Sequence, residues 1–269
     1  MKFGVAGIPV GCKRCNSEQG IRYVKSLGLD SMELEFVHGV RMSEETASSI
    51  GRIAEDLGVT ISSHAPYYIN LLSRDKEVVT NSEEHIIRAL KITDRAGGYV
   101  TAIHTGYMID ILGEEQNYKI VRERYSKIEE FREQNSIRCK LGPESRGKRR
   151  GFGSLSQLIK LYEDLDVLPV FDIAHMHATG EFDFTKSSEF YRFFKSVDRI
   201  EKLHIHFSEI DYNHNGERRH LNLGERYQPD YRMFIDISKE LGLDINVILE
   251  TPDLERSALL MKEYYLKTV

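Results

Sequence analysis

The sequence has no tryptophan, only 3 cysteines and only 6 prolines among its 269 residues. So few cysteines, and an odd number of them, cannot build a disulfide framework, so we expect a buried apolar core to hold the fold together. No apolar run approaches the roughly 20 residues that cross a membrane, and no signal-peptide pattern precedes the first predicted strand. With 41% hydrophobic and 29% charged residues, the composition is typical of a globular protein. We expect a cytoplasmic monomer with no membrane partner.

Two of the cysteines, Cys12 and Cys15, form a C-x-x-C motif after the first predicted strand. This spacing is compatible with zinc binding or redox chemistry. A second pair for a four-cysteine zinc site is missing, and a thioredoxin-type helix does not follow. We therefore interpret Cys12 and Cys15 as two loop thiols.

The net charge of -5 disfavours a nucleic-acid partner, because phosphate binding depends on lysine and arginine. Bound divalent cations would offset this charge where they are bound. A basic segment, Arg146 with Lys148, Arg149 and Arg150, follows the fifth predicted strand. It is either a solvated loop or a substrate contact, and we retain Arg146 and Arg149 as candidate substrate-binding residues.

Short apolar, β-branched runs alternate with longer stretches of helical periodicity along the chain. The predicted strands are Phe3–Ile8, Ser31–Phe36, Val59–His64, Tyr99–His104, Ile137–Leu141, Val167–Asp172, Leu203–Phe207 and Ile245–Glu250. The predicted helices are Glu18–Leu27, Glu44–Leu57, Glu83–Ala96, Tyr118–Gln134, Leu155–Asp164, Ser187–Val197, Tyr231–Leu241 and Leu254–Leu266. Eight such repeats over about 250 residues are typical of a (β/α)8 TIM barrel. We predict an α/β fold, with residues 1–269 forming one barrel domain and Asp211–Arg219 forming a polar loop.

Histidines and carboxylates stand at or just beyond the ends of six of these strands. They are His64, His104, Glu144, Asp172, His204 and Glu250. Since the carboxyl ends of parallel barrel strands share one rim, these side chains are expected to converge. Burying them together without a cation would be costly in desolvation and repulsion. The pattern predicts a divalent metal site, with zinc, manganese and iron all compatible with these ligands.

Several motifs around these residues are similar to one known family. They are Ser63–Leu71 (SHAPYYINL), Ile103–Gly106 (IHTG), Pro143–Ser145 (PES), Phe171–His175 (FDIAH), Leu203–Ile205 (LHI), His220–Glu225 (HLNLGE) and Ile248–Thr251 (ILET). In this order they resemble endonuclease IV, the AP endonuclease family 2, within the xylose-isomerase-like barrels. The resemblance implies a metal-dependent hydrolase of DNA repair that cuts DNA 5′ to abasic sites with two or three zinc ions.

The resemblance also implies a distribution of ligands among the metals. One metal would be held by His64, His104 and Glu144. A second would be held by Glu144, as a bridging and catalytic group, together with Asp172, His204 and Glu250.

The resemblance further implies that His175 and His220 hold a third metal. Tyr67 corresponds to an aromatic residue at the DNA interface, although rim packing is an equal alternative. His206 lies two residues beyond His204 on the same strand face, so it is a candidate contact to substrate or metal.

One position departs from the family pattern. The family has an aspartate two residues before the histidine that matches His220, whereas this chain has Arg218, with Glu217 beside it. Either Glu217 replaces the missing ligand, or the Arg218 guanidinium takes the place of the third metal's charge and binds phosphate. We favour Arg218 as a catalytic residue, which predicts two bound metals.

Two other functions remain open. Sugar isomerases and epimerases of the same superfamily hold one metal with four ligands, which here would be Glu144, Asp172, His204 and Glu250. The two outer carboxylates then serve as acid and base on a small sugar. A non-catalytic relative that binds metal or DNA is the third possibility.

Overall fold

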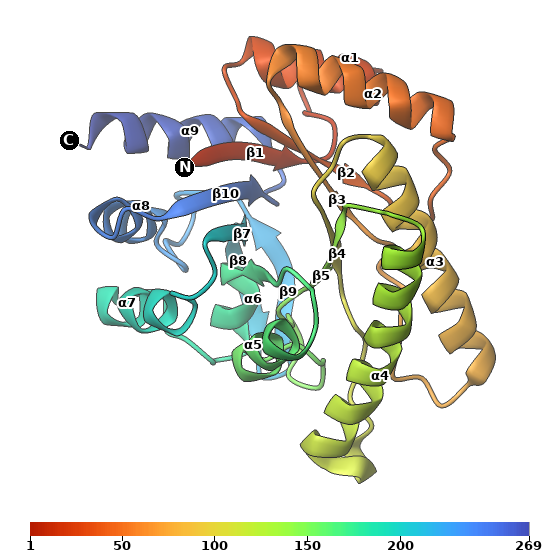
Figure 1. Cartoon of the computed structure of the whole chain (residues 1–269). Helices are drawn as coiled ribbons and strands as arrows, with labels where there is room; N and C mark the ends of the chain where they lie inside the picture. Colours follow the sequence, from red (N-terminus) through yellow and green to blue (C-terminus); the bar gives the residue numbers. More distant parts are fainter. Residues whose placement is uncertain (269) are drawn as a thin grey trace. The chain divides into compact units, whose positions relative to one another are not determined.

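The structure is a computed structural model, and it describes residues 1–268. The chain divides into two compact units (Figure 1). Unit 1 comprises Met1–Met32, Gly147–Arg149 and Phe171–Val269, and unit 2 comprises Glu33–Arg146 and Arg150–Val170.

Strands and helices alternate through both units. The strands are β1 (Lys2–Ala6), β2 (Ser31–Glu35), β3 (Thr60–His64), β4 (Val100–Ile103), β5 (Lys140–Pro143), β6 (Val170–Asp172), β7 (Lys202–Phe207), β8 (Glu209–Asn213), β9 (Gly216–Leu221) and β10 (Asp244–Leu249). The α-helices are α1 (Ser17–Ser26), α2 (Glu44–Leu57), α3 (Lys76–Arg95), α4 (Gly113–Gln134), α5 (Leu155–Asp164), α6 (Ile173–Ala178), α7 (Ser187–Ser196), α8 (Tyr231–Glu240) and α9 (Glu255–Lys267). Apart from helix α6 and the β8–β9 hairpin, this is the predicted βα order, and two helices, α2 and α5, have the predicted bounds.

In unit 1 the strand order is β1, β10, β7, β6, and β10 pairs in parallel with both β1 and β7. Helices α7, α8 and α9 pack in sequence, each against the next (Figure 1). Phenylalanines pack between these helices and the strands. The ring centroid of Phe207 in β7 lies 5.1 Å from that of Phe234 in α8. Phe194 of α7 lies 5.8 Å from the same ring. Each such buried ring contributes about 1.5–3 kcal/mol, so this core fixes β7 firmly.

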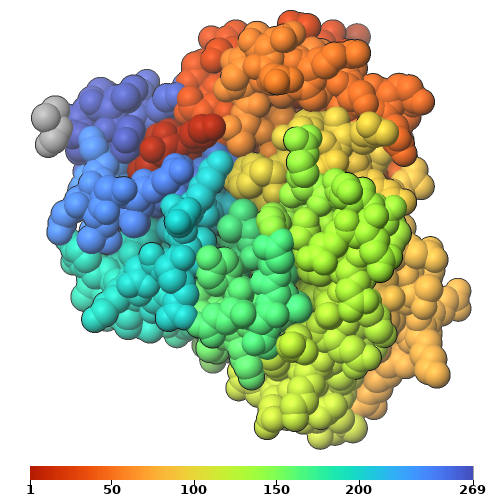
Figure 2. Space-filling model, in the orientation of Figure 1, coloured from red at the N-terminus to blue at the C-terminus, as the bar shows by residue number. Residues whose placement is uncertain are grey.

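In unit 2 the strand order is β5, β4, β3, β2, and β4 pairs in parallel with β3 and β5. Helix α3 packs against α2 and α4, and Figure 2 shows the outer faces of α3 and α4 as adjoining yellow and green surface. Helix α3 begins at Lys76 and not at the predicted Glu83, because Asp75 caps it by accepting a hydrogen bond of 2.9 Å from the Glu77 amide. The parallel pairing aligns the carboxyl ends of β3, β4 and β5.

Two elements of unit 1 differ from the sequence expectation. Asp211–Arg219 was expected to be a loop, but most of it belongs to the antiparallel β8–β9 hairpin. Its tip is solvated on both faces, so the ribbon lacks the alternation of apolar and polar residues that signals a strand. Helix α6, six residues long, was also not predicted; it begins at Ile173, directly after Asp172, which caps it by accepting a 2.7 Å hydrogen bond from the His175 amide.

The interpretation of Cys12 and Cys15 as two loop thiols is wrong, because a disulfide bond joins them. Their Cα atoms are 5.6 Å apart, within the range that a disulfide spans, because the chain turns back between them. Cys139, by contrast, is buried and free. Over residues 1–268, each helix is too short or too polar to cross a lipid bilayer.

Candidate metal centres

Unit 2 brings three of the predicted ligands together at the carboxyl ends of its strands. His64 is the last residue of β3, His104 follows β4, and Glu144 follows β5. One carboxylate oxygen, Glu144 Oε2, lies 2.9 Å from His64 Nε2 and 3.3 Å from His104 Nε2. The Glu144 side chain is fully buried, whereas a third of the His104 side chain is exposed. We refer to these three residues as the first centre.

The orientation of the His64 ring suits a cation ligand. Its Nδ1 lies 2.7 Å from the Ala65 carbonyl oxygen, which can only accept, so Nδ1 carries a hydrogen and donates. In the neutral ring, Nε2 then presents a lone pair toward the Glu144 carboxylate. Two electron pairs in a buried site repel each other unless a proton or a metal ion lies between them. A histidine that donates its second nitrogen to a carbonyl is also the usual arrangement of a metal ligand.

Unit 1 contains a second group around helix α6 and the hairpin. Donor atoms of Asp172, His175 and His220 all lie within 4.8 Å of one another. Glu217 joins the two histidines, with Oε2 3.4 Å from His175 Nε2 and Oε1 3.5 Å from His220 Nε2. We refer to these four residues as the second centre. Its donor set of two imidazoles and two carboxylates suits zinc, manganese or iron.

The charges in the second centre are strongly coupled. Burial raises the pKa of Glu217, but hydrogen bonds from His175 and His220 outweigh burial, so its pKa falls far below the usual range. Burial lowers the pKa of His220, but the Glu217 hydrogen bond and the charges of Glu250 and Asp172 raise it above its ordinary value. The centre therefore attracts a positive charge, which a proton or a metal ion can supply.

A backbone segment closes over the second centre. The Glu217 amide donates a 2.8 Å hydrogen bond to the Gly147 carbonyl oxygen. A β-carbon at Gly147 would lie 2.5 Å from Glu217 Oε2 and 2.8 Å from His175 Cδ2. A larger residue here would force Glu217 or His175 to shift, because real β-carbons do not approach other atoms so closely.

Strand β7 places a further histidine beside the second centre. Donor atoms of Asp172, His206 and Glu250 lie within 4.8 Å of one another, and His206 Nδ1 is 3.2 Å from Glu250 Oε1. His204, the residue expected at this position, lies one pleat earlier, and its ring centroid is 5.2 Å from that of His206. His206 pairs with Ile248 in the parallel register, close to the end of β10, whereas His204 pairs with Asn246. Along the paired strands, His206 therefore lies closer to the level of Glu250 than His204 does.

A β-bulge explains why Glu217 and not Arg218 faces His220. Asp211 pairs with Arg219 and Tyr212 pairs with Glu217, so Arg218 is the extra residue of β9. Without the bulge, residues three apart on a strand point to opposite faces. The Arg218 side chain is 61% exposed and its Nη1 lies 3.5 Å from Asp211 Oδ2, away from the histidines. The sequence carries no signal for a bulge at this place, so reasoning from residue spacing favoured Arg218.

The candidate substrate contacts lie in different environments. Tyr67 is 62% exposed, and its ring centroid lies 6.2 Å from that of His38. Arg146 is half-buried and donates a 3.0 Å hydrogen bond to the Gly151 carbonyl oxygen. Arg149 is exposed, and its backbone amide donates to the Asn215 carbonyl oxygen at 3.1 Å. Tyr67 and Arg149 thus present side chains to solvent, as contacts to a large substrate would.

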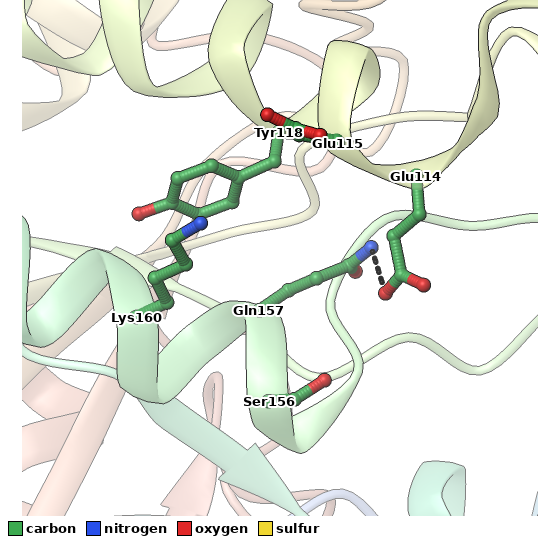
Figure 3. Close-up of a pocket in the computed structure, with 6 residues that line it drawn as sticks. All are labelled: Glu114, Glu115, Tyr118, Ser156, Gln157 and Lys160. Atoms are coloured by element: carbon green, nitrogen blue, oxygen red, sulfur yellow. Dashed lines mark hydrogen bonds between the residues drawn. The ribbon is translucent and has the colours of Figure 1, made fainter.

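A pocket of about 300 Å³ lies elsewhere in unit 2, lined by residues of α4 and α5 (Figure 3). Its charged groups already have neighbours: Lys160 Nζ lies 4.2 Å above the Tyr118 ring, and Gln157 donates to Glu114 at 3.3 Å. The lining residues include no member of either centre. This pocket is therefore not the candidate metal site.

Comparison with known proteins shows the family to which this chain is similar. Residues 21–264 match the family described as xylose isomerase-like TIM barrel. An uncharacterized protein of Methanocaldococcus jannaschii is 33% identical over 269 residues, covering 98% of this chain and 96% of its own length. A probable endonuclease 4 of Ureaplasma urealyticum is 26% identical over 219 residues, covering 77% of this chain and 70% of its own length.

Solved structures show the same fold. Endonuclease IV from Thermus thermophilus superposes with a TM-score of 0.79 at 16% identity, covering 100% of both chains. A D-tagatose 3-epimerase-like protein superposes with a TM-score of 0.74 at 22% identity, covering 99% of this chain and 97% of its own. The predicted TIM barrel fold and the predicted resemblance to endonuclease IV are confirmed.

Proposed function

The chain belongs to the xylose isomerase-like TIM barrel family, and within it we propose a metal-dependent phosphodiesterase that hydrolyses DNA 5′ to abasic sites. The observation that carries this proposal is the first centre. His64 and His104 both lie within 3.3 Å of the same buried oxygen of Glu144. A single-metal sugar isomerase would need only the carboxylate of this trio, whereas the resemblance to endonuclease IV implies that all three hold a metal.

The second centre supports the same function. It adds four ligands in unit 1, and each centre has enough donors for its own ion. We propose zinc at both centres, with His206 and Glu250 as further ligands beside the second. When bound, zinc activates water near neutral pH and stabilises negative charge on phosphate oxygens.

The residues of the chain have separate tasks in this proposal. His64 is held in one orientation by its hydrogen bond to Ala65, so Nε2 needs no reorganisation to bind a cation. Arg149 supplies positive charge for a phosphate outside the metal sites. Tyr67 offers an exposed ring on which a base can stack. The cytoplasmic location expected from the sequence stays a prediction.

A second candidate is a sugar epimerase with one metal. The observation that favours it is the group of Asp172, His206 and Glu250, in which two carboxylates flank a histidine within 4.8 Å. Two such carboxylates can act as acid and base on a ketose.

One experiment separates the two candidates. Zinc-loaded protein is incubated with a duplex that carries one abasic site, and in parallel with a panel of ketoses, each with and without a chelator. We expect chelator-sensitive incision, reduced by about 100-fold or more in His64→Ala and His104→Ala. His214→Ala, at the exposed hairpin tip, is the matched control and should retain full activity. Ketose turnover without incision would overturn the nuclease and favour the epimerase.

A further inference from the structure

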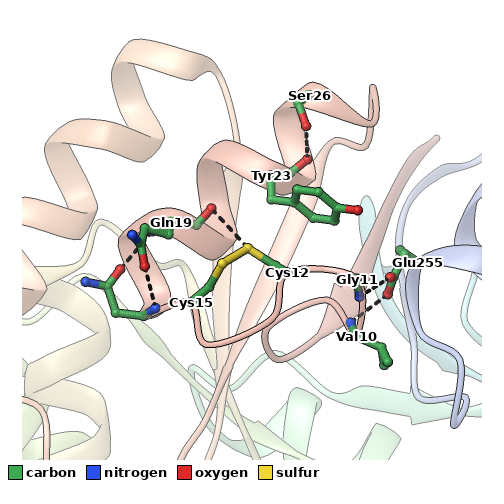
Figure 4. Close-up of a disulfide and its surroundings, with 9 residues drawn as sticks. Val10, Gly11, Cys12, Cys15, Gln19, Tyr23, Ser26 and Glu255 are labelled. Carbon is green, nitrogen blue, oxygen red and sulfur yellow. Dashed lines mark hydrogen bonds between the residues drawn. A yellow bond between two sulfur atoms is a disulfide. The ribbon is translucent and has the colours of Figure 1, made fainter.

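The loop after β1 contains a disulfide bond that the proposed function does not use. Cys12 and Cys15 close a ring of four residues, shown in Figure 4. Both cysteines are partly exposed, and Lys13 and Arg14 between them are exposed. The ring therefore lies at the surface, where a dissolved reactant can approach it.

The chain is fixed immediately before this ring. Glu255, the first residue of α9, accepts hydrogen bonds of 2.9 Å from the Val10 amide and 2.6 Å from the Gly11 amide (Figure 4). Gly11 also lies so close to Tyr23 that an added β-carbon would be 2.6 Å from its hydroxyl oxygen. This side of the ring cannot shift without breaking both contacts.

The chain is equally fixed immediately after the ring. Asn16 caps α1 by accepting a 2.9 Å hydrogen bond from the Gln19 amide. The Gln19 side chain accepts a 3.0 Å hydrogen bond from the Asn16 amide in return. The four residues from Cys12 to Cys15 therefore form a short segment between two anchored points.

Within the ring, the backbone adopts a conformation that arginine rarely takes. Arg14 has a φ of 60°, in the left-handed region, and the Cys15 amide donates to the Cys12 carbonyl oxygen at 3.2 Å. Such a conformation persists only where the surroundings enforce it. The Arg14 side chain is exposed, so we infer that the covalent bond between Cys12 and Cys15, together with the Cys15 hydrogen bond, holds the turn.

We propose that Cys12 and Cys15 form a reversible thiol–disulfide site whose co-reactant is a dithiol. A thiolate of the dithiol attacks one sulfur, the Cys12–Cys15 bond breaks, and the other cysteine leaves as a thiolate. The second thiol of the reductant then attacks the mixed disulfide and releases the first cysteine. Two electrons and two protons pass to the protein, and the dithiol becomes a disulfide. Positive charge from Lys13, Arg14 and the start of α1 stabilises the leaving thiolate.

Reduction would change only the ring. Arg14 would return to a common backbone conformation, while the Glu255 contacts and the Asn16 cap would remain. The site is thus a local redox switch in the loop at the carboxyl end of β1, the end of barrel strands where functional loops lie.

The test equilibrates native protein with mixtures of reduced and oxidised dithiothreitol, then traps free thiols in the folded protein with excess N-ethylmaleimide and acidifies only afterwards. Mass spectrometry should find Cys12 and Cys15 unlabelled at the oxidised end, both labelled at the reduced end, and the change reversible. Cys139 serves as the internal control, because burial raises its pKa to about 12 and should keep it unlabelled in native protein. Labelling of Cys12 and Cys15 at the oxidised end, or reduction only after unfolding, would overturn the proposal.

Amide exchange measured by NMR tests the structural part. The Cys15 amide should exchange at least about 10-fold faster after reduction, because it loses its hydrogen bond to the Cys12 carbonyl oxygen. The amides of Val10, Gly11 and Gln19 should keep their protection. The Cys12→Ser, Cys15→Ser double variant should match the reduced protein at every dithiol ratio. Unchanged exchange of Cys15 in both cases would contradict the switch, whatever substrate the protein acts on.

Discussion

A glycine that touches the second centre offers a sharp test of whether that centre binds metal. In Gly147→Ala the new β-carbon would lie 2.5 Å from Glu217 Oε2 and 2.8 Å from His175 Cδ2. Gly147 does not have a left-handed φ, so alanine suits its backbone and the effect is steric. Either the side chains of Glu217 and His175 move away from residue 147, or the backbone at residue 147 moves away from the β8–β9 hairpin.

The size of the effect follows from overpacking. Inserting one methyl group into a tightly packed site costs about 1–3 kcal/mol. If Glu217 and His175 move to relieve it, a metal that needs both loses a similar binding free energy, which is about 5-fold to 150-fold in affinity. The stability of the metal-free protein should change less, because alanine also restricts the unfolded chain by about 0.4–1 kcal/mol.

The assay is calorimetric titration of metal-free protein with zinc, combined with elemental analysis after dialysis. We expect one class of sites to weaken in Gly147→Ala while the class formed by His64, His104 and Glu144 keeps its affinity. Arg149→Ala is the matched control in the same segment, because its exposed side chain does not enter the centre. Equal stoichiometry and affinity in Gly147→Ala and the unchanged protein would refute the assignment of the second centre as a metal site.

Three further predictions follow from the same structure. Glu217→Ala should lose one bound zinc per chain, whereas Arg218→Ala should keep the full count, and elemental analysis would contradict us if the two variants behaved alike. His206→Ala should weaken zinc binding by about 10-fold or more, whereas the effect of His204→Ala should be smaller; the reverse order in titrations would return the ligand to His204. The hydrogen bond from Lys186 lowers the pKa of Asp183 to about 2. The small, solvent-screened contribution of Asp183 to stability is therefore present above pH 3.8 and lost as the pH falls through about 2. NMR titration of the unchanged protein and of Lys186→Ala would measure it.

The barrel elements could be predicted because each has a local signal. Helix α2 begins after Ser43, which caps it, and ends at Gly58, whose φ of 65° suits glycine. The first centre was equally accessible, since His64, His104 and Glu144 follow one another at intervals of 40 residues. One ligand per βα unit, at the same end of each strand, becomes a cluster as soon as the strands pair in parallel.

The positions of the other proposed ligands depend on features that no spacing rule contains. Strand β7 carries two histidines on one face, and only the register with β10 shows that His206, opposite Ile248, reaches the level of Glu250. On β9, the bulged Arg218 brings Glu217 to the face of His220. Because of the bulge, Glu217 lies on the same face as His220 although it is three residues before it. On a regular strand, a carboxylate two residues before the histidine would share that face. Glu217 thus offers a negative charge where the resemblance to endonuclease IV implied an aspartate, which supports our proposal of a metal at the second centre over an arginine that replaces it.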